Sequence, residues 1–355
     1  MKRIGVLTSG GDAPGMNAAI RAVVRTALQH GMSVVGFKRG YNGLLMRSPI
    51  QTDDFEILTS RSVSDKIHRG GTFLRTARCK EFEDLSVQKQ AVSNLRALGI
   101  EGLVCIGGDG TLRGAEALNN LGMATIGVPG TIDNDLSYTD YTIGFDTALN
   151  TACDCLNKIR ETSDSHERAS LLTVMGRNCG DIALHTAVIC GAEVCMIPEI
   201  KWDIVEVAHL VKFGVLRGKR SMILVFAEGA LSSLTTDINA LCSQHPALTK
   251  ILPHGAIVSS SEVAEVIEYL SGHDTRSTVL GYIQRGGSPS ARDRWLATRL
   301  GAHAADLLAE DRGGLAVGVR GPELIEAPFT DVQKGPHRAN LGLEKLVDIM
   351  AYISR

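Results

Sequence analysis

A length of 355 residues makes two domains of ordinary size the default expectation. The composition, with 44% hydrophobic and 21% charged residues, is that of a globular protein and excludes a disordered chain, a collagen-like repeat and a coiled coil. The 37 Lys and Arg nearly balance the 39 Asp and Glu, so no global basic field attracts nucleic acid or an anionic membrane. Any bound anion must therefore be held by local groups.

Parallel α/β layers are predicted by short apolar runs that alternate with Gly-rich turns and helical periodicity. The predicted strands cover residues 4–7, 33–37, 102–106, 125–128, 171–175, 194–197, 222–226 and 277–280. The 38 glycines favour the tight strand-to-helix turns of nucleotide-binding proteins, although close packing of small residues would also raise the Gly content. Residues 230–272 are the least patterned stretch, which we interpret as an inserted or divergent surface region.

The first predicted helix covers residues 16–30 and carries one apolar stripe that should pack on the sheet. The stripe consists of Ile20, Val23, Val24, Ala27 and Leu28. Gly31 is expected to cap the carboxyl end. Arg21 and Arg25 lie one turn apart on the other face, where a solvated surface is the simplest interpretation.

The first Gly-rich motif, residues 8–17, joins the strand at 4–7 to this helix. Such a turn directs backbone N–H groups and a helix N-terminus toward an anion, and Gly10 and Gly11 permit close approach. The motif lacks the Lys-Ser/Thr of a P-loop and the G-x-G-x-x-G order of a dinucleotide site. A purely structural turn explains it nearly as well.

The second motif, Gly107-Gly108-Asp109-Gly110-Thr111, follows the apolar strand at 102–106. An aspartate at the end of a strand, beside glycines that leave room for a nucleotide, suits Mg²⁺ next to a triphosphate, and the Thr hydroxyl could reach a phosphate. The alternative is that the aspartate only caps the following helix, with Gly114 at its start.

The third motif, Thr131-Ile132-Asp133-Asn134-Asp135, follows the strand at 125–128. Two carboxylates two residues apart are costly to crowd at a strand end unless a cation or a proton transfer uses them. One could act as a base while the other holds a metal ion. The arginines that could bind anions lie beside glycines or strand ends and are Arg75, Arg78, Arg168, Arg177, Arg276 and Arg285.

The eight cysteines form no C-x-x-C pair and lie mostly in apolar stretches, so we expect buried free thiols in a reducing cytosol. The residues that follow Met1 leave no room for the apolar core of a signal peptide, and no run of 18 apolar residues occurs elsewhere. We expect a cytoplasmic protein that binds neither nucleic acid nor membranes.

The sequence resembles the bacterial ATP-dependent 6-phosphofructokinases through five motifs in order. They are Gly10-Gly11-Asp12, Gly107-Gly108-Asp109-Gly110, Thr131-Ile132-Asp133-Asn134-Asp135, Met175-Gly176-Arg177 and Gln284-Arg285-Gly286-Gly287. The resemblance implies an α/β fold of two Rossmann-like three-layer α/β/α domains with the active site in the cleft between them. Residues 1–144 plus 284–335 would form the ATP-binding domain, and residues 145–283 plus 336–355 the sugar-phosphate-binding domain.

The same resemblance implies that Mg-ATP phosphorylates the 1-hydroxyl of fructose 6-phosphate, giving fructose 1,6-bisphosphate and ADP, the committed step of glycolysis. Catalysis would use Asp133 as the base with Thr131, Gly11 and Arg78 around the phosphoryl group, and Mg²⁺ would be held by Asp109 and Asp135. The ATP-binding residues would be Gly11, Tyr41, Arg78, Cys79, Gly108, Asp109, Gly110, Thr111 and Gly114. The sugar phosphate would be held by Thr131, Asp133, Asp135, Met175, Gly176, Arg177, Glu228, Tyr282 and Arg285, with Arg168 and Arg276 reaching in from a neighbouring subunit of a homotetramer.

The resemblance also implies an effector site for ADP or phosphoenolpyruvate, which revises the surface interpretation of the first helix. Its residues would be Arg21, Arg25, Asp65, Arg160, Gly191, Glu193, Arg217 and Lys219. Two departures alter the pattern. Ser60 stands where an Arg is expected, with Arg61 adjacent, and Tyr282 stands where bacterial members often have a phosphate-binding His.

Single residues argue against two alternatives to an ATP-dependent enzyme. Pyrophosphate-dependent relatives usually carry Asp where this chain has Gly110 and Lys where it has Gly130, and those side chains would compete with the ATP α-phosphate for space. A regulatory subunit without catalysis would have lost Asp133 or Asp109, and both are present.

Overall fold

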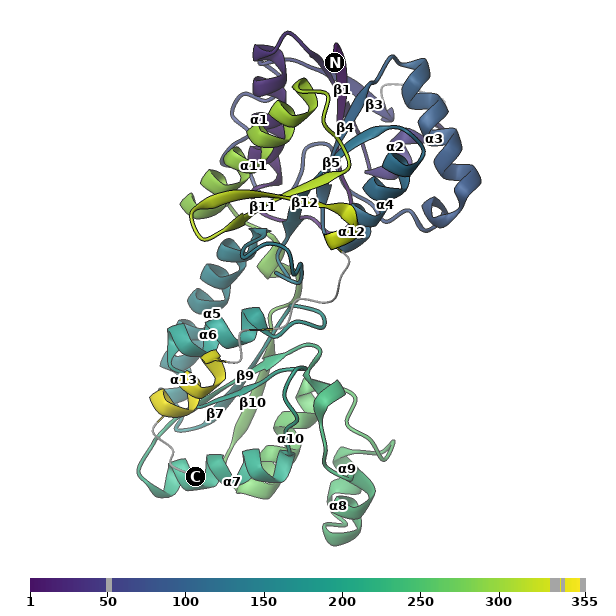
Figure 1. Ribbon diagram of the computed structural model, residues 1–355. Coiled ribbons are helices and arrows are strands. Elements are labelled where there is room, and N and C mark those ends of the chain that lie inside the picture. Colours follow the sequence, from purple (N-terminus) through teal and green to yellow (C-terminus); the bar gives the residue numbers. More distant parts are fainter. Residues whose placement is uncertain (49–52, 333–338, 340–341, 352–355) are drawn as a thin grey trace. The chain divides into compact units, whose positions relative to one another are not determined.

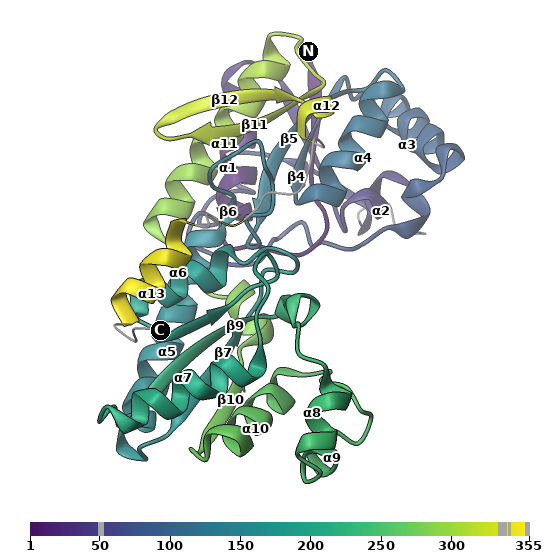
Figure 2. The same cartoon turned by 60° about the horizontal axis from the view of Figure 1, so that its bottom comes forward.

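The computed structural model describes residues 1–48, 53–332, 339 and 342–351. The chain divides into two compact units (Figures 1 and 2). Unit 1 comprises Met1–Ala148 and Arg285–His337, and unit 2 comprises Leu149–Gln284 and Arg338–Arg355. Among the described residues, none of the helices combines the length and the apolar character that a membrane span requires.

Unit 1 is built on a mostly parallel sheet. Within the described part of the chain this sheet has eight strands in the order β12-β11-β5-β4-β1-β2-β3, with β6 paired to β5. The strands are β1 (Arg3–Thr8), β2 (Ser33–Phe37), β3 (Phe55–Leu58), β4 (Gly102–Gly107), β5 (Ala124–Thr131), β6 (Ile143–Gly144), β11 (Leu315–Arg320) and β12 (Glu323–Pro328). The outer strands β3 and β12 run antiparallel to their neighbours. Every residue of β4 is buried, as expected of a central strand covered on both faces.

Helices cover both faces of this sheet (Figure 1). On one face α1 (Met16–Gln29) packs along α11 (Ala291–Ala309). The other face carries α2 (Tyr41–Leu44), α3 (Leu85–Ala97), α4 (Asp109–Asn120) and α12 (Phe329–Val332), with the short 3-10 helix η2 (Lys80–Glu83).

Unit 2 has a second, all-parallel sheet in the order β10-β7-β9-β8. Its strands are β7 (Ala169–Val174), β8 (Val194–Met196), β9 (Met222–Ala227) and β10 (Thr275–Val279). Its helices are α5 (Phe145–Ser165), which begins in unit 1, α6 (Asp181–Cys190), α7 (Ile204–Leu216), α8 (Ile238–Gln244), α9 (Leu248–Ile251), α10 (Ser260–Ser271) and α13 (Gly342–Ala351), with the 3-10 helices η3 (Ala230–Ser233) and η4 (Gly281–Arg285). The chain moves from β7 past β9 to β8 and then returns to β9, so right-handed crossovers place α6 and α7 on opposite faces (Figure 1).

All eight predicted strands are present. Only β2 has the predicted bounds, and the differences in β5, β7 and β10 bear on predicted site residues. β5 continues through Thr131, because Gly130 and Thr131 pair with β6 and Pro129 pairs with β4. β7 ends at Val174, so Met175 already belongs to the loop, and β10 begins at Thr275, so Arg276 lies within a strand. The sequence did not predict β3, β6, β11 and β12.

Four smaller predictions need correction. α1 begins as predicted and ends one residue early at Gln29, and Leu28 on its supposed buried stripe is 37% exposed. α4 begins at Asp109, which puts Gly114 in the middle of the helix and not at its start. The supposed surface region 230–272 contains α10, a helix with a capping box and a buried apolar face that packs on α7 and β10. Of the eight cysteines only Cys105 and Cys179 are buried, and the others are partly exposed.

Candidate active site

Three predicted motifs lie at the carboxyl ends of three neighbouring parallel strands of unit 1. The first follows β1, the second follows β4 and the third completes β5. From β1 the chain continues to β2 on one side, whereas β4 lies on the other side, so this edge of the sheet is a topological switch point. In open α/β sheets ligands bind at such points.

The loops after β1 and β4 are tied directly to each other. The backbone N–H of Ser9 donates to the carbonyl of Ile106 at 3.0 Å, and the Thr111 hydroxyl donates to the carbonyl of Ser9 at 3.1 Å. A Cβ atom on Gly107 would lie 2.3 Å from the Thr111 hydroxyl oxygen and 2.5 Å from the Ser9 carbonyl oxygen. Only glycine therefore permits this approach, and the Thr111 hydroxyl is used in holding the two loops together.

Asp109 is the first residue of α4 and is partly exposed at the end of β4. Its carboxylate pairs with Arg113, one turn along the helix, at 2.8 Å. The residue at the N-cap position is Gly108, and no side chain caps the helix. The capping role considered as an alternative for Asp109 is therefore absent, and a carboxylate beside the glycines is left at the helix start.

Asp133 is 4% exposed at a turn that its neighbour Asn134 determines. Asn134 adopts a left-handed conformation with φ 51°, which Asn tolerates better than most residues. Its side-chain oxygen accepts from the N–H of Thr142 at 3.0 Å, and its amide donates to the carbonyl of Asp140 at 3.3 Å. The Thr142 hydroxyl donates to the carbonyl of Thr131 at 2.6 Å. These contacts fix the turn that separates Asp133 from Asp135. The sequence placed Asn134 in the third motif without a role for it, and it did not single out Thr142.

The segment that carries Arg75 and Arg78 lies against the first motif. The Asn17 amide donates to the carbonyls of Arg69 and Gly70, and its oxygen accepts from the N–H of Phe73 at 2.9 Å. Further along, the Thr76 hydroxyl donates to the carbonyl of Gly10 at 2.8 Å. Both arginines of this segment are exposed. Buried Asn17, which the sequence did not single out, thus holds a basic loop beside a Gly-rich turn.

Arg285 covers Gly11 within unit 1. A Cβ atom on Gly11 would lie 2.0 Å from an Nη atom of Arg285, so any larger residue there would make the guanidinium move. The Nε atom of Arg285 is buried and has no hydrogen-bond partner among the described residues. A buried cationic donor without a partner is costly, which indicates a site for an anionic ligand.

Tyr41 and Gly114 pack against each other beneath α4. Tyr41 is 4% exposed, its ring stacks on Phe82 at 4.2 Å, and its hydroxyl donates to the carbonyl of Thr111 at 2.5 Å. Burial raises the pKa of Tyr41 well above its ordinary value. A Cβ atom on Gly114 would lie 2.6 Å from the Tyr41 ring. Both residues thus support the start of α4 by packing. Half-buried Cys79, whose pKa burial raises, is the N-cap residue of η2, which contains Phe82.

The donor set fits a magnesium ion that also binds phosphate oxygens. Asp109 and half-buried Asp135 follow the adjacent strands β4 and β5, and both offer carboxylate oxygens. Mg²⁺ usually takes one or two protein carboxylates and completes its shell with water and substrate phosphates. Among the described residues no group of three or more His, Cys, Asp or Glu side chains is placed to hold a metal ion.

In unit 2 four of the predicted sugar-phosphate residues, Met175, Gly176, Arg177 and Glu228, follow the carboxyl ends of β7 and β9. The N–H of Arg177 donates to the Glu228 carboxylate at 2.7 Å, and the N–H of Glu228 donates to the carbonyl of Val174 at 2.9 Å. The N–H of Met175 donates to the side chain of Gln284, which is fully buried, at 2.8 Å. Gln284 is therefore a supporting residue of this loop, although the prediction of site residues left it out.

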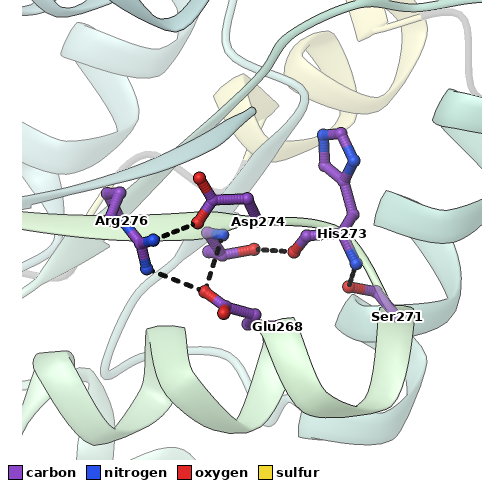
Figure 3. Close-up of polar contacts among 6 residues, drawn as sticks. Glu268, Ser271, His273, Asp274 and Arg276 are labelled. Atoms are coloured by element: carbon purple, nitrogen blue, oxygen red, sulfur yellow. Dashed lines mark hydrogen bonds and ion pairs between the residues drawn. The ribbon is translucent and has the colours of Figure 1, made fainter. Parts of the chain in front are cut away.

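Arg168 and Arg276 lie at the other end of these strands. Arg168 directly precedes β7 and Arg276 is the second residue of β10, so about 20 Å of strand separates them from the Met175 loop. The Arg276 guanidinium is held by Asp274 at 2.7 Å and by Glu268 of α10 at 3.0 Å (Figure 3). Within unit 2 these arginines do not join the loops at the carboxyl edge. Tyr282 lies in η4 with 82% exposure.

The predicted effector residues are divided between the two units. In unit 2, Arg160 donates to the carbonyl of Cys190 at 2.5 Å and to that of Gly191 at 3.2 Å. Glu193 pairs with Lys219 at 2.9 Å, and the Arg217 guanidinium lies 4.5 Å from the centre of the Phe213 ring. In unit 1, burial and the charge of Arg25 lower the pKa of Arg21, and exposed Asp65 has a positive φ of 54°.

Comparison with known proteins identifies the family. A model of the family described as phosphofructokinase matches residues 3–308. The chain belongs to the phosphofructokinase family. It is 49% identical over 326 residues to the ATP-dependent 6-phosphofructokinase of Clostridium tetani, with 92% of each chain covered. It is 47% identical over 355 residues to that of Clostridium acetobutylicum, with both chains fully covered.

Solved structures of the phosphofructokinase family share the fold. The phosphofructokinase of Saccharomyces cerevisiae superimposes with a TM-score of 0.80 at 32% identity over 99% of this chain, which spans 48% of the yeast chain. A pyrophosphate-dependent phosphofructokinase from Marinobacter aquaeolei gives a TM-score of 0.75 at 23% identity, with 96% of this chain and 86% of that chain covered. The predicted α/β architecture of two Rossmann-like domains is confirmed.

Proposed function

We propose that this phosphofructokinase transfers the γ-phosphoryl group of ATP to the 1-hydroxyl of fructose 6-phosphate, giving fructose 1,6-bisphosphate and ADP, the committed step of glycolysis. The observation that carries the proposal is the buried carboxyl of Asp133, set by a fixed turn beside the Gly-rich loops of β1 and β4. The relatives that align along 92% or more of the chain are named for the ATP-dependent reaction.

Asp133 accepts the proton of the 1-hydroxyl as that oxygen attacks the γ-phosphorus. General bases act within hydrogen-bond reach of the proton, and the Asn134 turn keeps the carboxyl in one place. Thr131, Gly11 and Arg78 surround the phosphoryl group, where positioning and charge neutralisation supply most of the rate. Asp109 and Asp135 would hold Mg²⁺, which neutralises phosphate charge when bound.

Unit 2 supplies the groups that recognise the sugar phosphate. The Met175–Arg177 loop, Glu228 and Tyr282 would provide backbone, carboxylate and hydroxyl partners for a phosphorylated sugar. The guanidinium of Arg285 would pair with its phosphate. We further propose a cytoplasmic homotetramer in which Arg168 and Arg276 act on a neighbouring subunit. The effector residues of both units would then bind ADP or phosphoenolpyruvate.

The preference for ATP rests on Gly110 more than on Gly130. A Cβ atom on Gly110 would meet nothing closer than Arg113 at 3.8 Å, so an aspartate there would project into open space beside the nucleotide loop. A Cβ atom on Gly130 would lie 2.9 Å from Ile106 and 3.2 Å from Met16, both in the core. Core packing therefore explains Gly130, and only Gly110 bears on the choice between ATP and pyrophosphate.

The test is turnover of fructose 6-phosphate with Mg²⁺ and either ATP or pyrophosphate. We expect activity with ATP and little with pyrophosphate. Asp133→Asn should lower kcat at least about 10²-fold with a smaller change in the KM for fructose 6-phosphate, because the base is lost and the binding groups remain. Asp140→Asn, which alters an exposed carboxylate in the same turn region, is the control and should retain activity. Near-normal turnover of Asp133→Asn would remove Asp133 as the base.

A further inference from the structure

Two thiols of unit 2 lie in contact where α5 meets the end of α6. Cys153 is on α5 and Cys190 is the last residue of α6. The two thiols hydrogen-bond to each other, and both are partly exposed. Arg160, two turns after Cys153 on the same face of α5, donates to the carbonyls of Cys190 and Gly191. One face of α5 therefore contacts the carboxyl end of α6 through a thiol pair and through a guanidinium.

The surroundings make the two thiols chemically different. The carboxyl end of a helix normally disfavours an anion. At the end of α6, however, the Arg160 guanidinium places a positive charge beside the carbonyls of Cys190 and Gly191. Donation from the Cys153 thiol and the Arg160 charge lower the pKa of Cys190, while the same contact raises the pKa of Cys153. Cys190 is thus the more readily ionised sulfur, and the thiolate is the form that reacts with oxidants.

We propose that Cys153 and Cys190 are a modification site at which a peroxide forms a reversible disulfide. The Cys190 thiolate attacks a peroxide oxygen, which breaks the O–O bond and leaves a sulfenic acid and, for hydrogen peroxide, water after protonation. The Cys153 sulfur then attacks the Cys190 sulfur, an S–S bond forms, and the sulfenic oxygen leaves as water. Two thiols and one hydrogen peroxide thus give one disulfide and two waters. Gly191, with φ 62°, follows Cys190 and gives this helix end freedom to reach disulfide spacing.

The disulfide would tie α5 to the end of α6, where Arg160 of α5 already contacts the carbonyl of Gly191. Both belong to the effector residues of the proposed function, so this consequence rests on that function. In the reduced protein Arg160 can leave the α6 carbonyls for an anionic effector, whereas the cross-linked protein holds α5 against α6. We therefore expect the oxidised enzyme to respond less to the effector.

The chemical test counts thiols in the full-length protein under denaturing conditions after mild hydrogen peroxide treatment. The count should fall from the eight free cysteines to six, and dithiothreitol should restore eight. Mass spectrometry of the digest should show the Cys153–Cys190 link. Cys153→Ser and Cys190→Ser should each abolish the link. Cys155→Ser is the matched control, since Cys155 is two residues along α5 and about 200° around the helix from Cys153. A loss of two thiols from Cys153→Ser on the same peroxide treatment, or over-oxidation of Cys190 without a link in wild type, would overturn the proposal.

The functional arm measures the effector-induced shift of half-saturation for fructose 6-phosphate before and after oxidation. The shift should shrink in wild type and in Cys155→Ser, return with dithiothreitol, and stay unchanged in Cys153→Ser. An unchanged shift in a protein with the link would overturn the coupling to Arg160. If the reduced enzyme responds to neither ADP nor phosphoenolpyruvate, the effector assignment fails, while the thiol count still decides the disulfide.

Discussion

Asp293 is a buried carboxyl that accepts hydrogen bonds at the start of a helix, and its protonation makes the stability of the protein depend on pH. It is 1% exposed in the first turn of α11 and accepts from the N–H of Gly144 at 2.9 Å and of Thr147 at 2.8 Å. The Thr147 hydroxyl donates to it at 2.5 Å. It therefore caps the amino end of α5 from another helix. Burial raises the pKa of Asp293 to about 6 and outweighs the opposing effect of these hydrogen bonds.

We predict that the wild-type protein loses stability relative to Asp293→Asn as the pH rises from about 4 to above 6. The unfolded carboxyl titrates near 3.8 and the folded one near 6, so in this window the folded state keeps a proton that the unfolded state has lost. The carboxyl's stabilising contribution is thus present at low pH and falls by up to about 3 kcal/mol with rising pH. Urea unfolding of both proteins at several pH values measures this. If the free energies of unfolding of the two proteins change in parallel with pH, the prediction is wrong. Asp311→Asn, which alters an exposed carboxylate, is the control.

The carboxylates of the site could be predicted from sequence, whereas the residues that hold them could not. Asp109 and Asp133 stand in Gly-rich or Asp-rich motifs after apolar strands, where carboxyl groups have few structural uses. Asn17 and Gln284 act by hydrogen bonds to backbone atoms 52 to 109 residues away. Because these partners are set by the tertiary fold, no local pattern marks them.

α4 contains two glycines, of which Gly110 faces open space and Gly114 is packed against a buried ring. A Cβ atom on Gly110 would enter open space, whereas one on Gly114 would meet the buried Tyr41 ring at 2.6 Å. Neither glycine has a positive φ. The helix therefore needs only one of them for packing.

We predict that Gly110→Ala raises the free energy of unfolding by about 0.5–1 kcal/mol, because alanine favours a helix more than glycine does. Gly114→Ala should lower it by about 1–3 kcal/mol, because the methyl group displaces the Tyr41 ring from its stack on Phe82. Chemical denaturation followed by circular dichroism measures both, and the two variants are each other's control. A stabilising Gly114→Ala would show that Tyr41 moves at little cost.

At the level of elements, the longer strands that are buried at every position could be predicted, whereas β3, β6, β11 and β12 were missed. β4 and β9 are buried at every position and read as continuous apolar runs. β3 and β12 lie at the sheet edges with half-exposed residues, so their sequences carry a weak pattern. β6 has two residues and depends on its pairing with β5, which only the folded chain provides.

We predict that activity returns when inactive Asp133→Asn and Arg276→Ala chains are mixed. The proposal that Arg276 serves a neighbouring subunit is supported by its place at the opposite strand end from the Met175 loop. In a two-fold interface each mixed pair has one site with both defects and one intact site. With random association half of the pairs are mixed, so about a quarter of wild-type activity should return.

The measurement is ATP-dependent turnover at high fructose 6-phosphate after co-refolding or co-expression of equal amounts. Mixing Asp133→Asn with a second Asp133→Asn preparation is the control and should restore nothing. If mixed oligomers form without rescue, Arg276 acts within its own subunit or not at all.

The division of unit 1 between two stretches of sequence has a consequence for biosynthesis. Residues 149–284, which form the whole sheet of unit 2, leave the ribosome as one continuous stretch. β11, which pairs with β5, ends at Arg320 and is made only afterwards. Until then the residues of β5 that pair with β11 have no partner on that side, and such an unpaired strand edge can pair with other chains. We therefore expect the half made first to finish folding last, and the nascent chain to need protection of that edge by a chaperone.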